Sequence, residues 1–136
     1  MLIRMDLARI IIVETGDSQV IILKERDGDR HFPILIGINE ALAIDRRLKG
    51  LKTPRPLTHD LMASIIEQLD GVLEKIVISD LREHTFFARL VVRRNGKVVE
   101  IDSRPSDAIA LGAAVGTPIF VEDDVLREVW SENSNP

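Results

Sequence analysis

The chain has 136 residues and a formal net charge of −4. Of its residues, 45% are hydrophobic and 29% charged, which is typical of a soluble globular protein with one core. It contains no cysteine, which excludes disulfides, thiolate metal sites and a cysteine nucleophile. No apolar run approaches the roughly 18 residues that span a membrane, and the first ten residues carry Arg4, Asp6 and Arg9. We therefore expect a cytoplasmic protein with no membrane partner.

The first third of the chain predicts strands. "RIIIVE" and "QVIILKE" are rich in β-branched residues and are separated by the turn-forming "TGDS". Asp27-Gly28 is a hairpin signal that leads into "HFPILI". A helix is then predicted from Asn39, which suits the N-cap, to Gly50, which suits the left-handed residue after a helix.

The middle of the chain predicts one helix and a set of hairpins. The prolines in "TPRP" at 53–56 break the chain. Thr58 is the predicted N-cap of a helix over 58–69, whose apolar residues recur at helical spacing. "VLEKIVISDL", "TFFARLVVRR" and "KVVEID" predict three further strands, and Asn95-Gly96 joins the last two.

The last third predicts a helix over 104–115, opening at Pro105 because proline suits the first helical position. "TPIFVE" predicts a short strand and "EDDVLREVW" a short final helix.

Hairpins with helices inserted between them indicate an α+β fold: a mixed, largely antiparallel sheet with three main helices plus a short C-terminal helix. We expect a single domain over 1–130 followed by a frayed tail at 131–136. Because sheet edges need covering, we also expect a homo-oligomer, most simply a two-fold dimer.

A basic segment follows the first predicted helix. Residues 46–55, "RRLKGLKTPR", hold five basic side chains and no acid: Arg46, Arg47, Lys49, Lys52 and Arg55. A solvated helix face is the usual meaning of such a run. A local anion-binding patch is the alternative.

Two polar blocks open the second and third main helices. In "IDSRPSD" at 101–107, helix initiation explains Pro105 and, through the helix dipole, Asp107. It does not require Asp102 or Arg104, and an arginine at a helix start meets the unfavourable end of the dipole. We therefore expect Arg104 to pair with Asp60, Asp102 or Asp107.

The other block is "RPLTHDLM" at 55–62. A solvated helix start is sufficient to explain Thr58, His59 and Asp60. A histidine, an aspartate and neighbouring arginines are also what a phosphodiester-cleaving site needs, because they supply a base or metal ligand and a cation for the phosphoryl oxygens.

Together, "RPLTHDLM" and "IDSRPSDAIALGAAVGTPIFV" at 101–121 resemble the signature blocks of the bifunctional nuclease family. "ISDLREHTFFARL" at 78–90 and "FPILIGINEALAI" at 32–44 resemble further parts of that family, so the similarity covers nearly the whole chain. The family name comes from members described as degrading DNA and RNA. The resemblance therefore implies DNA or RNA as the partner.

Two functions follow as hypotheses. The first is a metal-assisted nuclease, in which carboxylates hold Mg²⁺ or Mn²⁺ and arginines hold the substrate phosphate. Its catalytic residues would be His59, Asp60 and Asp107, its metal ligands Asp60, Asp102 and Asp107, and its substrate contacts Arg55, Arg104, Arg46 and Arg47. The alternative is a non-catalytic, regulatory module in which two helix N-termini and two arginines bind an anion, a nucleic acid or a protein partner. Both hypotheses require the two Arg-Pro blocks to meet in space.

Overall fold

A computed structural model describes residues 1–13 and 15–134 of the chain, with side chains as far as Trp130. In this part of the chain the elements are β1 (Leu2–Ile11), β2 (Gln19–Glu25), β3 (His31–Ile36), α1 (Ile38–Leu48), α2 (Thr58–Gln68), β4 (Gly71–Arg82), β5 (Thr85–Arg94), β6 (Lys97–Ser103), α3 (Pro105–Ala113), β7 (Ile119–Glu122) and α4 (Asp123–Ser134). The α+β prediction is confirmed.

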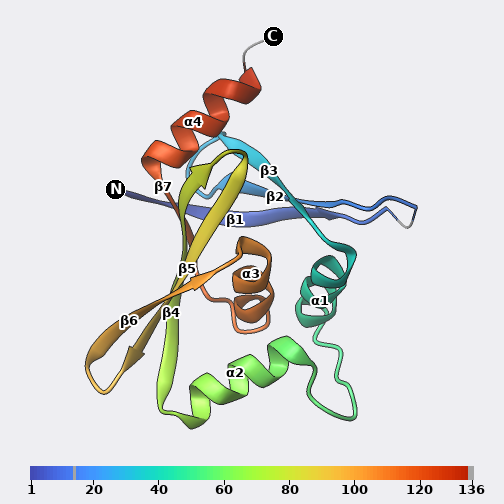
Figure 1. The fold of residues 1–136 in the computed structure, drawn as a ribbon, viewed down its shortest axis with the longest axis vertical. Coiled ribbons are helices and arrows are strands. Elements are labelled where there is room, and N and C mark those ends of the chain that lie inside the picture. Colours follow the sequence, from blue (N-terminus) through green and yellow to red (C-terminus); the bar gives the residue numbers. More distant parts are fainter. Residues whose placement is uncertain (14, 135–136) are drawn as a thin grey trace.

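All the strands belong to one sheet with the order β3-β2-β1-β7-β4-β5-β6. Every neighbouring pair is antiparallel except β4 and β7, which are parallel. The sheet is therefore mixed and largely antiparallel, as predicted. It is strongly twisted, so β1 and β2 run crosswise to β4 and β5 (Figure 1).

The turns within the sheet use left-handed backbone in two different ways. Asn95 and Gly96, between β5 and β6, have φ values of 50° and 75°, which suits both residue types and confirms the predicted hairpin. Glu83 and His84, between β4 and β5, have φ values of 49° and 66°. Glutamate rarely adopts that conformation and costs on the order of 1 kcal/mol there, whereas histidine is one of the non-glycine residues enriched in it.

The helix starts differ from the predicted caps by one or two residues. The N–H of Ala41 bonds to the carbonyl of Gly37 at 3.0 Å, so α1 begins at Ile38 and Asn39 lies inside it. Leu57, not Thr58, occupies the cap position of α2. The Asp60 carboxylate, in the third helical position, bonds back to the Leu57 N–H at 3.1 Å, which fixes Leu57 as the residue before the helix.

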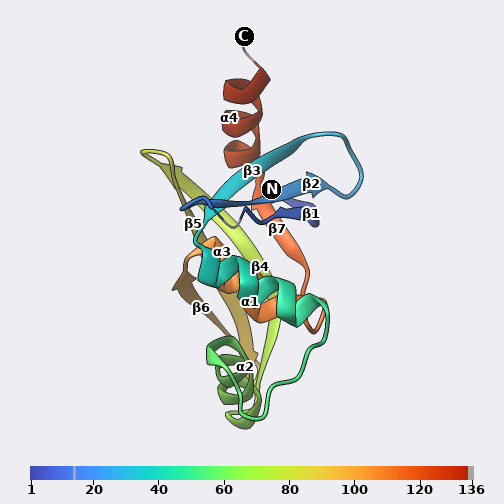
Figure 2. The same ribbon diagram turned by 90° about the vertical axis from the view of Figure 1, so that its right-hand side faces the viewer.

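Helix α3 is the centre of the fold. It begins at Pro105 as predicted, and Ala108, Ile109 and Leu111 are at most 1% exposed. It contacts β4 and β5 of the sheet together with α1 and α2, and α1 crosses in front of it in the side view (Figure 2). A Cβ at Gly112 would lie 2.8 Å from the Ile76 side chain, so this glycine allows α3 to pack closely on β4.

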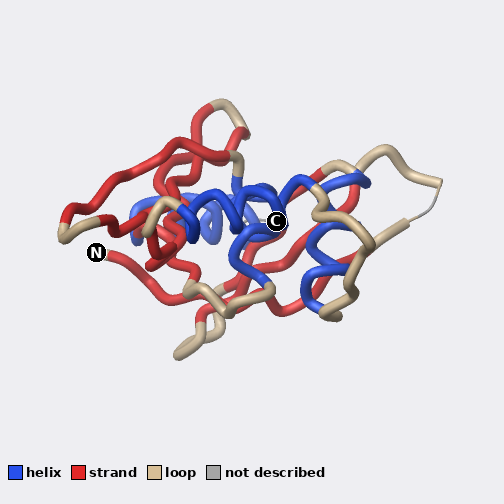
Figure 3. Tube along the Cα trace, turned by 90° about the horizontal axis from the view of Figure 1, so that it is seen from below, coloured by secondary structure: helices blue, strands red, loops and turns tan. Residues whose placement is uncertain are grey.

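The ends and edges of the fold bear on two further predictions. Helix α4 continues to Ser134, and 135–136 lie outside the described residues. The single domain over 1–130 with a frayed tail at 131–136 stays a prediction. The sheet ends in β3 on one side and β6 on the other. These are the edges that a dimer was expected to cover, and the dimer stays a prediction. Most loops lie around the periphery when the molecule is viewed from below (Figure 3).

No helix in the described ranges is both long and apolar enough to cross a membrane.

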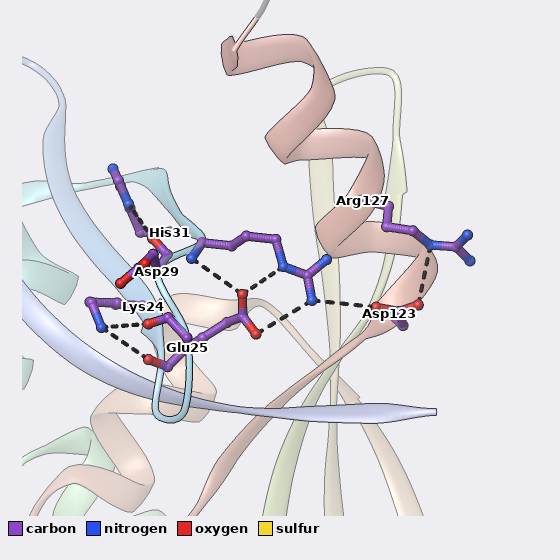
Figure 4. A network of polar contacts seen from close by, with 8 residues as sticks. Lys24, Glu25, Asp29, His31, Asp123 and Arg127 are labelled. Carbon is purple, nitrogen blue, oxygen red and sulfur yellow. Dashed lines mark hydrogen bonds and ion pairs between the residues drawn. The ribbon is translucent and has the colours of Figure 1, made fainter.

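A network of charged side chains ties α4 to the turn between β2 and β3 (Figure 4). Arg30 Nε donates to Glu25 Oε1 at 2.6 Å, and Arg30 Nη2 lies 3.7 Å from Asp123 Oδ1. Asp123 in turn pairs with Arg127 at 3.2 Å. Hydrogen bonding from Arg30 lowers the pKa of Glu25, so this carboxylate is ionised and bound at neutral pH.

We predict that Arg30→Met lowers the free energy of unfolding by about 1–2 kcal/mol, because it leaves the Glu25 carboxylate, only 14% exposed, without its cation. Arg26→Met is the matched control, since the Arg26–Asp6 pair is about half exposed on both sides. It should cost less than about 0.5 kcal/mol. Urea denaturation measures both, and equal losses would contradict a special role for Arg30.

Candidate functional site

A cleft of about 640 Å³ lies where α1, the loop that follows it, and the first turns of α2 and α3 meet. Its charged and titratable lining consists of Glu40, Arg46, Arg47, His59, Asp60, Arg104 and Asp107. These residues come from both Arg-Pro blocks and from α1. The two blocks, 48 residues apart at their contact, therefore do meet in space.

A chain of polar contacts crosses this cleft. His59 Nε2 lies 3.0 Å from Asp107 Oδ1, and the two side chains are 12% and 26% exposed. The other oxygen of Asp107 accepts from Arg104 Nε at 2.9 Å, and Arg104 Nη2 donates to Glu40 Oε1 at 3.1 Å. The chain His59–Asp107–Arg104–Glu40 thus links α2, α3 and α1, and the predicted pairing of Arg104 is confirmed for Asp107.

The environment of Asp107 fixes its charge and orients the histidine. Burial raises its pKa, but hydrogen bonds from Arg104 and His59 together outweigh burial, and the pKa lies below the ordinary value. An ionised carboxylate only accepts hydrogen bonds. His59 Nε2 therefore carries the proton, and in the neutral ring Nδ1 is left as a base.

Arg47 holds the cleft together. Its side chain is 11% exposed and pairs with Asp60 at the start of α2. Its Nε and Nη2 donate to the carbonyls of Ala110 and Leu111, at 2.5 and 2.9 Å. These are two of the last four carbonyls of α3, which have no partner inside the helix. Arg47 was predicted as a substrate contact, but its nitrogens are engaged within the chain.

Arg46 is the better placed of the two adjacent arginines to meet an anion. It lines the cleft, and in the part of the chain that the structure describes its guanidinium has no hydrogen-bond or ion-pair partner. Arg55 lies on the neighbouring loop, is exposed, and does not line the cleft.

Asp102 lies apart from the other predicted site residues. Its neighbours Ile101 and Ser103 pair with Leu90 and Ala88 on the core face of β5, whereas Asp102 pairs with Arg89. Because side chains alternate along a strand, Asp102 points to the opposite face, where it lines another pocket.

The three predicted metal ligands are therefore not assembled by the fold. Asp60 and Asp107 line the cleft, but each is paired with an arginine, Arg47 and Arg104 respectively. Among the described side chains, those of residues 1–13 and 15–130, there is no group of three or more His, Cys, Asp or Glu that would hold a metal ion. The Mg²⁺ or Mn²⁺ site stays a prediction.

Glu40 is the site residue that the sequence did not indicate. It lies in the first turn of α1, where an acid is already explained by the helix dipole. Its partner Arg104 is 64 residues away, so no local pattern connects the two.

The chain is similar to known proteins over most of its length. The family model described as "Bifunctional nuclease domain" matches residues 21–134. Two curated proteins of Mycobacterium tuberculosis, from strains CDC 1551 and H37Rv, are 44% identical to this chain over 119 residues, which is 87% of this chain and 71% of each relative. Both are described as uncharacterised proteins.

We predict that Asp107→Asn lowers the free energy of unfolding at pH 7 by about 1–2 kcal/mol, more than the roughly 0.3–1 kcal/mol that loss of a dipole contact alone would cost. The folded pKa of Asp107 is lowered, so its contribution is complete above the unfolded value of about 3.9. It is lost as the pH falls through the folded pKa. Urea denaturation from pH 7 to pH 3 should therefore show parent and variant converging in acid.

Asp102→Asn is the control for this experiment. Asp102 is exposed and has no ion pair among the described residues, so its replacement should change the free energy of unfolding by less than about 0.5 kcal/mol. A gap between parent and Asp107→Asn that stays constant down to pH 3 would contradict the assignment.

Proposed function

Because this chain belongs to the bifunctional nuclease domain family, we propose that the cleft between α1, α2 and α3 hydrolyses phosphodiester bonds of DNA or RNA. The observation that carries the proposal is the 3.0 Å contact between His59 and Asp107. It places an oriented imidazole, backed by an ionised carboxylate, in a cleft that also presents arginines.

His59 is the proposed general base. Nδ1 takes a proton from the attacking water as the oxygen of that water bonds to phosphorus. The bond from phosphorus to the leaving oxygen breaks, and the leaving oxygen takes its proton from solvent. Asp107 holds the ring in the tautomer with an unprotonated Nδ1 and stabilises the imidazolium that forms. General-base catalysis of this kind contributes about 10²–10⁴-fold to a rate.

Arg46 is the proposed phosphate-binding cation. Its guanidinium has no partner among the described residues, so a phosphoryl group can bind to it without breaking an existing ion pair. Negative charge on the phosphoryl oxygens increases during the displacement, and a fixed cation stabilises it. Arg104 supports the site from the other side through its bond to Asp107.

A divalent cation does not fit this mechanism as the residues stand. Asp60 and Asp107 would each have to give up an arginine, and Asp102 would have to come from the opposite face of the sheet. We therefore assign no step to Mg²⁺ or Mn²⁺, and the assay below tests their effect directly.

One observation favours the non-catalytic alternative. The carboxylates of Glu40, Asp60 and Asp107 are all paired within the cleft, so the polar network is complete without a substrate. A module that only binds an anion at Arg46 is compatible with this, and it predicts binding of nucleic acid without cleavage.

We predict that the purified protein cleaves a single-stranded oligonucleotide and that His59→Gln lowers kcat by about 10²–10⁴-fold. Asp107→Asn should lower kcat similarly, because the histidine loses its orientation. Cleavage is followed on denaturing gels, with Mg²⁺, with Mn²⁺ and with EDTA. His31→Gln is the control, because His31 lies on β3 outside the cleft.

Three results would be decisive. Full activity of His59→Gln would exclude the proposed base. Activity that EDTA abolishes would show that a cation is required after all. Binding of the oligonucleotide without cleavage by the parent protein would establish the non-catalytic alternative.

We predict a separate effect for Arg46→Met: an increase in KM of about tenfold, since a charge-assisted contact to phosphate is worth about 1.5–3 kcal/mol before screening by solvent. Arg9→Met removes the same charge from an exposed position on β1 that has no partner among the described residues. Equal changes in KM for the two variants would indicate a general charge effect in place of a contact in the cleft.

A further inference from the structure

A second pocket, of about 650 Å³, adjoins the cleft and shares Arg104 with it. Its floor is formed by β3, and its walls by the β4–β5 turn, the start of α3, and Asp17 and Ser18 before β2. We propose that this flanking pocket binds the nucleoside next to the phosphate held in the cleft, so that the substrate is single-stranded nucleic acid. The inference rests on the function proposed above and adds the part of the substrate beyond the scissile bond.

The floor of the flanking pocket has the apolar surface that a base requires. Along β3 the residues Phe32, Ile34 and Ile36 are buried, whereas Pro33 and Leu35 face outward. Leu35 is 70% exposed, although its strand belongs to the main sheet. Bases of single strands bind to such apolar and aromatic surfaces through their faces, without dependence on sequence.

The walls supply polar groups for the edge of the base. His84, Thr85 and Ser106 line the pocket, and Ser106 is only 5% exposed. His84 is held there by a turn in which it and Glu83 both have positive φ. The Asn-Gly sequence of the next hairpin suits a turn of that hand. In the Glu83–His84 turn the cost in stability falls mainly on Glu83, because histidine is among the residues enriched at positive φ. Unstacked bases are recognised by hydrogen bonds to their edges.

Arg104 connects the two sites. Its Nε and Nη2 are bound to Asp107 and Glu40, which fixes the guanidinium at the junction. Nη1 has no hydrogen-bond partner among the described residues, and the side chain as a whole is 65% exposed. A sugar-phosphate chain that leaves the cleft over Arg104 therefore meets a positioned donor before its nucleoside reaches the flanking pocket.

A nucleotide fits this pocket better than a peptide strand added to the edge of β3. Such a strand would depend on a regular row of backbone donors and acceptors, and Pro33 has no N–H to offer. A base, in contrast, requires one apolar face and a few polar groups. A base must leave its stack before it can enter a pocket. We therefore expect a single strand to bind and a duplex not to bind.

The test compares two substrates that share the phosphodiester but differ in what flanks it: a single-stranded oligonucleotide and bis(4-nitrophenyl) phosphate. Leu35→Ser and His84→Asn change the floor and the wall of the flanking pocket. Both should raise KM for the oligonucleotide about tenfold and leave KM for bis(4-nitrophenyl) phosphate unchanged.

Glu83→Asn is the matched control. Glu83 lies in the same turn with the same sign of φ but does not line the pocket. Asparagine tolerates positive φ at either position, so neither variant adds strain to the turn. Removing the negative charge of Glu83 can only favour an anionic substrate, so this variant cannot imitate a loss of binding.

The outcomes separate this inference from the proposed nuclease activity. Cleavage of both substrates, with the oligonucleotide KM unchanged in Leu35→Ser and His84→Asn, overturns the flanking pocket and leaves the nuclease intact. An equal KM for a duplex of the same sequence also overturns it.

If the parent protein cleaves neither substrate, calorimetric titration with a dinucleotide and with a mononucleotide tests the flanking pocket. The pocket requires the dinucleotide to bind about tenfold more tightly, with the difference lost in both variants, and equal affinities overturn it.

Discussion

Three helices of this protein are held in place by one guanidinium. Arg47 projects from the last turn of α1, bonds to two terminal carbonyls of α3, and pairs with Asp60 in the first turn of α2. A charged group that is 11% exposed is stable only when its donors are satisfied. Here the donors meet two carbonyls that have no partner inside α3 and an acid at the start of α2. The position of the cleft follows from that arrangement.

The pairing of charges also decides what the cleft can do. Of the three arginines that line it, Arg47 and Arg104 are bound to carboxylates, and these pairs keep the walls rigid. That leaves His59 and Arg46 to act on the scissile phosphate, one as a base and the other as a cation. A rigid frame around a small number of reactive groups favours electrostatic preorganisation, because the charges need not reorganise when a phosphate binds.

The sequence predicted the elements better than the site. Local patterns were sufficient for the hairpin at Asn95-Gly96 and for the helix opening at Pro105, since both depend on residues a few positions apart. The cap of α2 was missed by one residue, because Asp60 bonds back to the N–H of Leu57 and makes that residue, and not Thr58, the cap position.

The contacts across the site were harder to predict, because they join residues that are distant in the chain. The pairing of Arg104 with Asp107 is local and was expected, whereas its pairing with Glu40 spans 64 residues and carries no sequence signal. Asp102 was included because it belongs to the second Arg-Pro block and helix initiation does not require it. The alternation of side chains along β6 would have shown that it faces the other way.

The position of β7 has a consequence for how the protein is made. Strands β1 to β3 and strands β4 to β6 are each connected by hairpins, but the two groups are joined only through β7, which lies between β1 and β4. During synthesis each group can form its hairpins early, because these contacts are local. The complete sheet must wait until Ile119–Glu122 has left the ribosome. Until then the edges of β1 and β4 are unpaired, and a nascent chain stalled before this strand exposes both of them to association with other chains.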